Sequence, residues 1–153
     1  MRRLYRAIQT LLEADAGQDG DLGWLLGAVE GDTRVYQTAV QEHVQAANTG
    51  IRWVTYNKAA DVGDGAEQTT AIREGEIDFH CWGRDSDSGG VDAVHDRLKV
   101  VLDGKAQALH DLDENLLVMA CYYASYHKQF EPETKCWHVI ATYVVMYADA
   151  TEI

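Results

Sequence analysis

The chain has 153 residues, of which 46% are apolar, and its 25 acidic and 13 basic residues give a net charge of −12. This length is typical of one domain with a sizeable core, so we expect a single domain over residues 1–153. The acidic excess argues against binding to duplex DNA or to an anionic membrane, since both favour basic proteins. No apolar run reaches the roughly 20 residues of a membrane span. Three cysteines without paired spacing, Cys81, Cys121 and Cys136, indicate reduced thiols in the cytoplasm.

The N-terminal part of the chain predicts a helix and then two ambiguous pieces. Apolar residues recur at helical spacing from Leu4 to Leu12, and glycines at 17 and 20 end the pattern. The apolar residues within 22–26 fit either a helical turn or a packing plug. Residues 32–50 fit either a helical face or a short extended piece at Val35 and Tyr36, and periodicity does not separate these alternatives.

Two strands are expected next. Residues 51–56 are rich in β-branched and aromatic side chains, which favours a strand. A polar, glycine-containing loop is expected from Asn57 to Glu67. The second strand covers about 69–82, and its end alternates between apolar and polar residues, as in a strand with one buried face.

A second helix is expected over residues 90–103, where Val91, Val94 and Leu98 lie on one face. Helix-capping residues precede it at 85–90. The polar residues 105–115 indicate a connector.

Two further strands are expected over about 116–127 and 135–147, joined by a turn at 130–133. The second carries apolar residues on both faces, which is typical of a strand buried on both sides. One face is expected to meet the helices, and the other requires a second layer or a neighbouring subunit. The order is helix, strand, strand, helix, strand, strand. We therefore predict an α+β fold with a mainly antiparallel sheet and helices packed on one face.

Metal binding is not expected. Adjacent strand residues such as His80 and Cys81 point to opposite faces and cannot chelate one ion. Cys136 and His138 share a face, but two ligands fall short of the four that structural zinc requires.

Catalytic and cofactor-binding motifs are also missing from the sequence. It contains no G-x-S-x-G elbow, no Walker pattern and no dinucleotide-binding fingerprint. The acidic groups Asp85/Asp87 and Asp111/Asp113/Glu114 fit solvated loops. We therefore expect no catalytic residue, no cofactor and no enzymatic activity.

Aromatic residues are the remaining functional signal. They cluster on the strands without a basic groove, so subunit contact explains them better than stacking on nucleic-acid bases. The expected self-assembly or partner interface comprises Trp53, Trp82, Tyr122, Tyr126, Trp137 and Tyr143.

Three stretches carry a resemblance to a known family. Arg34-Val35-Tyr36 follows the first helix, and Glu76-Ile77-Asp78-Phe79-His80-Cys81-Trp82 closes the long second strand. Asp92-Ala93-Val94-His95-Asp96-Arg97-Leu98 opens the helix after it. In this order of elements the chain resembles the tail-completion, or tail-terminator, proteins of long-tailed phages and related viruses.

The resemblance implies a small α+β subunit that forms a ring of six copies at the head-proximal end of the tail tube. The ring would stop tube growth and join tail to head in the virion, after assembly in the host cytoplasm. Its partners would be other copies of the chain, the tail-tube protein and a head-completion or connector protein. An acidic lumen would let DNA pass without specific binding.

Other functions stay open at this point. A tail-tube subunit would form rings of the same geometry. So would another neck component, such as a head-completion adaptor. A small α+β ligand-binding domain or enzyme would need a cavity with convergent polar groups.

Overall fold

The computed structural model describes residues 2–17, 20–37, 51–62 and 72–152. Its elements are, in chain order, α1 (Arg2–Ala16), α2 (Asp21–Leu26), β1 (Val35–Gln37), β2 (Arg52–Val62), β3 (Arg73–Gly83), α4 (Gly89–Leu102), α5 (Ala106–Leu112), β4 (Leu116–Glu131), β5 (Cys136–Asp149) and the 3-10 turn η2 (Ala150–Glu152). The fold is α+β, as predicted.

The described strands form one sheet with the order β1-β2-β3-β5-β4. β1 pairs with β2 in parallel, and the other three pairs are antiparallel. The sheet is thus mixed and mainly antiparallel. The long strand β4 forms one edge, and the three-residue strand β1 forms the other.

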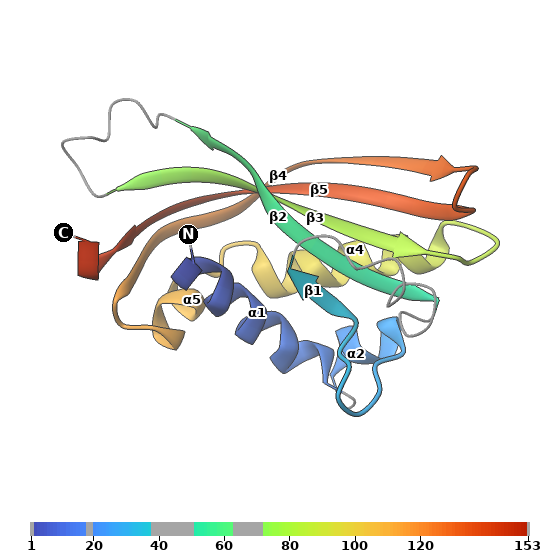
Figure 1. Cartoon of the computed structure of the whole chain (residues 1–153), viewed down its shortest axis with the longest axis horizontal. Helices are drawn as coiled ribbons and strands as arrows, with labels where there is room; N and C mark the ends of the chain where they lie inside the picture. Colours follow the sequence, from blue (N-terminus) through green and yellow to red (C-terminus); the bar gives the residue numbers. More distant parts are fainter. Residues whose placement is uncertain (1, 18–19, 38–50, 63–71, 153) are drawn as a thin grey trace.

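The helices lie on one side of the sheet (Figure 1), as the sequence predicted. Alternation along β3 explains this, because every second residue from Ile77 to Cys81 is buried towards the helices. The core contains the apolar stripes of the helices and the inward residues of the strands, including Leu4, Ile8, Leu12, Val94, Leu98, Tyr56, Phe79, Val139 and Tyr143. None of the described helices combines the length and apolar character needed to cross a membrane.

Charged contacts fasten the helices to one another. Arg97 of α4 donates two hydrogen bonds to the Asp15 carboxylate of α1, over 2.7 and 2.8 Å. Arg3 pairs with Asp113 after α5 and with Asp149 at the end of β5. The helix layer is therefore held together by polar contacts as well as by the core.

The predicted order of elements is wrong in three places, because it omits α2, β1 and α5. Residues 106–112 form α5 where a connector was expected, and residues 21–26 form α2, which agrees with the helical-turn alternative. The described order is two helices, three strands, two helices and two strands. Only Leu109 of α5 is fully buried, so this helix carries no apolar stripe that could reveal it.

Two predicted boundaries also change. Residues 57–62 continue β2 where a polar loop was expected, since they pair with β3. β4 extends through Phe130 and Glu131, where the sequence predicts a turn. At Val35 and Tyr36 the structure agrees with the extended alternative. The rest of the ambiguous segment, 38–50, and the rest of the expected loop, 63–67, lie outside the described residues.

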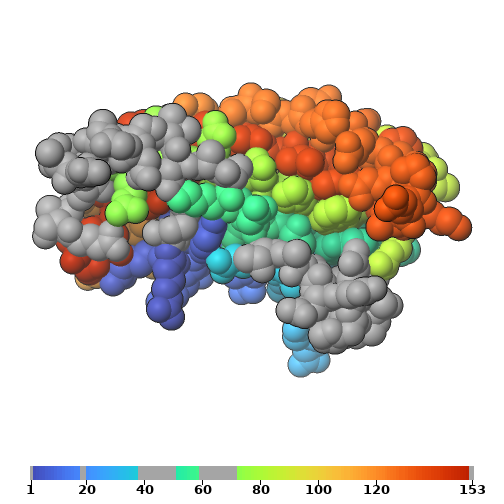
Figure 2. All heavy atoms as spheres, turned by 45° about the horizontal axis from the view of Figure 1, so that its top comes forward, coloured from blue at the N-terminus to red at the C-terminus, as the bar shows by residue number. Residues whose placement is uncertain are grey.

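β5 is apolar on both sides, as the sequence indicated. Val139, Ala141 and Tyr143 are buried beneath the helices. Ile140, Val144 and Met146 point to the opposite face, which we call the outer face of the sheet. Figure 2 shows this face with the strands side by side and no described helix over them.

Candidate assembly surface

Aromatic rings stack across the strands on the outer face. Trp53 of β2 and Trp82 of β3 are cross-strand partners, and their rings are nearly parallel at 6.0 Å. Trp82 also stacks on His138 of β5, with ring centroids 3.7 Å apart. The Arg84 guanidinium lies 4.7 Å from the Trp53 ring centroid. These stacked rings stiffen one end of the face.

A hydrogen-bonded relay extends from this stack. Nδ1 of His138 lies 2.9 Å from Oε1 of Glu131, and Nε2 of His138 lies 2.8 Å from Nδ1 of His80. Because an ionised carboxylate can only accept, His138 donates from Nδ1, and in the neutral ring its Nε2 accepts from His80. Two imidazoles from neighbouring strands are thereby fixed in orientation.

Burial favours the neutral form of both rings. Desolvation lowers the pKa of His80, and proximity to His138 lowers it further. Desolvation also lowers the pKa of His138, although the Glu131 carboxylate opposes this effect. Within the described residues, no three His, Cys, Asp or Glu side chains are arranged to bind a metal ion. Burial thus favours two neutral, hydrogen-bonded imidazoles at this place in the sheet.

Among the described elements, the edge strand β4 carries the most exposed large apolar side chains. They are Leu117, Met119, Tyr122, Tyr126 and Phe130. From Leu116 to Phe130 the strand contains no acidic residue, although the chain has 25 of them. A long edge strand with exposed apolar side chains invites pairing with another chain. β4 thus offers an edge with exposed apolar side chains and no acidic side chain of its own between Leu116 and Phe130.

One part of this edge is protected by the chain itself. The backbone N–H of Tyr123 donates to the Asp103 carboxylate, and the Cys121 carbonyl accepts from the N–H of Gly104. Both partners belong to the connection between α4 and α5. Beyond these positions, residues 124–131 have no further strand beside them among the described residues.

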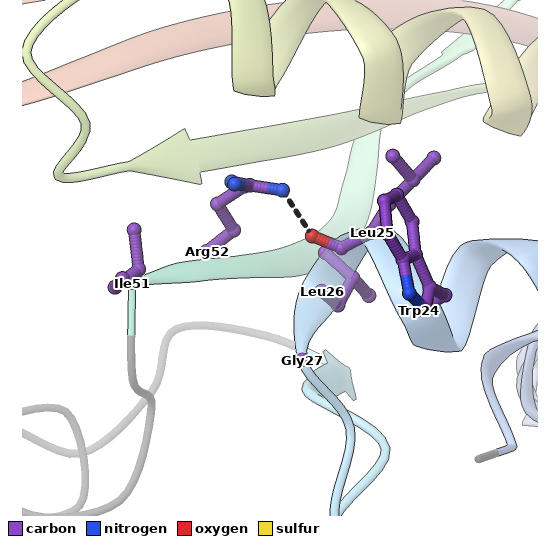
Figure 3. Close-up of a pocket in the computed structure, with 6 residues that line it drawn as sticks. All are labelled: Trp24, Leu25, Leu26, Gly27, Ile51 and Arg52. Atoms are coloured by element: carbon purple, nitrogen blue, oxygen red, sulfur yellow. Dashed lines mark hydrogen bonds between the residues drawn. The ribbon is translucent and has the colours of Figure 1, made fainter.

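A pocket opens on the other flank of the molecule (Figure 3). Its cavity of about 260 Å³ is lined by Trp24, Leu25, Leu26, Gly27, Ile51 and Arg52. Arg52 donates to the Leu25 carbonyl and to the Asp85 carboxylate, so its charge is compensated within the chain. Trp24 is 79% exposed and Ile51 57% exposed. The pocket therefore presents apolar surface with few unmet polar groups.

The structure separates the six predicted interface residues into three groups. Tyr122 and Tyr126 are exposed on β4, and Trp82 and Trp137 are half-buried. Trp53 and Tyr143 are covered within the single chain. Tyr126 and Trp137 point to the helix side of the sheet, whereas Tyr122 and Trp82 belong to the outer face. The six side chains therefore do not form one patch.

Sequence reasoning missed three prominent exposed residues. The sequence pattern places Phe130 in a turn, Ile51 at the start of a strand and Trp24 in a short apolar patch. The signal for Trp24 was its position beside two leucines between glycines. In a helix of only six residues, the leucines turn inward and the tryptophan points to solvent.

The whole arrangement is similar to a known structure. No protein-family model matches the sequence, and no curated protein matches it either. In the solved structure of the virion of a native gene transfer agent (GTA) particle, one chain has a similar fold, with a TM-score of 0.64 and 11% sequence identity. The similarity covers 95% of this chain and 91% of that chain. This protein thus has the fold of a virion chain over almost its entire length.

Proposed function

We propose that the chain is a structural subunit of a phage-like virion and acts as a tail terminator. In this role, six copies form a ring at the head-proximal end of the tail tube, stop tube growth and join tail to head. The observation that carries the proposal is the fold shared with a GTA virion chain over 95% of the sequence. A subunit of this kind acts by shape and charge and requires neither a catalytic residue nor a cofactor.

Two surface features support a self-assembling subunit. The open edge and exposed apolar side chains of β4 provide surface that a neighbour can bury. The net charge of −12 suits a ring through which DNA passes, since an acidic lumen repels phosphate. The proposed partners are copies of the chain, the tail-tube protein and a head-completion or connector protein. The proposed location is the tail or neck of the virion, after assembly in the host cytoplasm.

The test combines oligomeric state with tube length. Native mass spectrometry and electron microscopy of the purified chain should show closed rings of a fixed copy number. Added to growing tail tubes, the rings should shorten the mean tube length, and particles lacking the protein should carry overlong tubes or unjoined tails. Open filaments of the chain alone would favour a tube subunit. Tails of normal length, firmly attached to heads in its absence, would overturn the terminator role.

A further inference from the structure

We propose that copies of this chain join head to tail, with the exposed Phe130 ring on β4 of one copy entering the pocket beside α2 of the next. The pocket is the one lined by Trp24 and Ile51, and Tyr126, on the same side of β4, packs beside its rim. The inference rests on the proposed function in one respect, since it assumes that the chain assembles with itself. Beyond the proposed function, the inference identifies the two surfaces that meet.

The two rings are presented in fixed positions. Tyr126 is 57% exposed and Phe130 is 45% exposed, and both point to the same side of β4. Phe130 rests on Trp137 with ring centroids 5.2 Å apart, and Tyr126 rests on His95 at 5.0 Å. Because these contacts already restrict the rings, binding costs little side-chain entropy. Exposed, well-supported aromatic rings are typical anchors of protein interfaces.

The pocket fits an aromatic ring in size and chemistry. Its cavity of about 260 Å³ exceeds the roughly 150 Å³ that is known to hold a benzene molecule. Figure 3 shows Trp24 and Ile51 at its rim and the hydrogen bond from Arg52 to the Leu25 carbonyl. Since Arg52 is engaged by that carbonyl and by Asp85, an entering ring leaves no charge unpaired.

In the register of the sheet, the pocket and Phe130 lie at the same position along the strands. Arg52 at the pocket pairs with Gly83, Gly83 with Trp137, and Trp137 with Phe130. This single row crosses three strand spacings of about 4.8 Å each. The pocket and Phe130 therefore lie towards opposite flanks of the sheet with little displacement along the strands. When two different surfaces meet without a shift along the strands, neighbouring copies lie side by side. This arrangement favours a closed ring over an open helix.

Charge favours a second copy on this strand. The segment from Leu116 to Phe130 contains no acidic residue, and its Lys128 is engaged by Asp92 of α4. None of the six residues that line the pocket is acidic. A strand and a pocket that both lack acidic side chains avoid much of the repulsion that two copies of charge −12 experience elsewhere on their surfaces.

Two complementary variants test the contact. Phe130→Glu removes the ring and keeps the pocket, whereas Trp24→Glu damages the pocket and keeps the ring. Each variant alone should be monomeric, with assembly weakened at least tenfold. An equimolar mixture should form heterodimers, because the ring of one variant can enter the intact pocket of the other. The matched control is Val100→Glu, at a position 57% exposed on α4 outside both surfaces, which should assemble like the wild type.

A cross-link gives an independent readout. All three native cysteines are buried, so Ile51→Cys in one copy and Phe130→Cys in another introduce the accessible thiols. Oxidation of this mixture should yield a covalent dimer, and a mixture of Ile51→Cys with Val100→Cys should not. If the wild type forms rings but both glutamate variants also do, this contact is overturned and the ring stands. If the wild type is monomeric at every concentration, the proposed function itself fails.

Discussion

His138 sits between two groups that determine where its proton lies. The Glu131 carboxylate accepts from one ring nitrogen, and the other nitrogen accepts from His80. Protonation of both rings would place two positive charges on imidazoles whose centroids are 5.0 Å apart, and it would remove the acceptor at Nε2 of His138. The relay is therefore lost when both rings are protonated.

Protein stability should consequently depend on pH near neutrality. The pKa values of His80 and His138 are lowered from 6.5 in the folded chain, so the unfolded chain binds more protons in mild acid. The free energy of unfolding is at its full value above about pH 6.5 and decreases as the pH falls, by at most about 1.4 kcal/mol per pH unit for each histidine. Denaturant unfolding at a series of pH values measures this slope.

A variant of His80 isolates the contribution of the relay. His80→Asn should reduce the slope, because it removes one of the two titrating rings. Some slope should remain in this variant, because burial also lowers the pKa values of His138 and His95. An identical slope in the wild type and His80→Asn would contradict this account of the relay.

At the scale of elements, α4 is the helix that joins the two layers. It contacts three of the strands as well as α1 and α2, and Leu98 is fully buried in the core. Leu98→Ala should reduce the free energy of unfolding by about 2–5 kcal/mol, through lost apolar burial and the remaining cavity. Val100→Ala, on the exposed side of the same helix, should change it by less than about 0.5 kcal/mol. Equal effects in chemical unfolding would contradict the packing of this helix.

The position of α2 depends on one glycine. A Cβ at Gly23 would collide with the backbone carbonyl oxygens of Ala16 and Gly17. Gly23→Ala should therefore displace α2 and destabilise the chain by about 1–3 kcal/mol. In Gly17→Ala the new methyl meets only the Glu13 carbonyl oxygen, at 3.8 Å, so it serves as the control. Similar melting temperatures for the two variants would contradict this close packing.

The elements that the sequence predicted well are those whose periodicity matches their burial. The stripe of α4 and the alternation at the end of β3 are both visible in the residue pattern. α5 was missed because it buries one residue fully, and the continuation of β2 was missed because a polar stretch becomes a strand only through its partner β3. The pocket joins Leu25 to Arg52 across 27 positions, a proximity that no local pattern contains.

At the scale of the whole molecule, the acidic charge works against assembly. Each copy carries −12, so copies repel one another at low ionic strength. Salt screens this repulsion, with a Debye length of about 10 Å at 0.1 M. The fraction of assembled protein should therefore rise with added sodium chloride, as measured by light scattering. Phe130→Glu should stay monomeric over the same range, and dissociation of the wild type by salt would indicate that ion pairs dominate the contact.

The exposure of Trp24 makes the molecule its own optical probe. Trp53 is 1% exposed and stacked on Trp82, whereas the indole of Trp24 is 79% exposed. Indole fluorescence shifts to shorter wavelength when surrounding water is removed. The buried Trp53 gives a constant background during assembly. The largest shift in emission comes from Trp24, with a smaller one from the half-buried Trp137, which lies against Phe130 at the same contact. The joining of copies can thus be followed in the emission spectrum of the unlabelled protein, from the first contact to the closed ring.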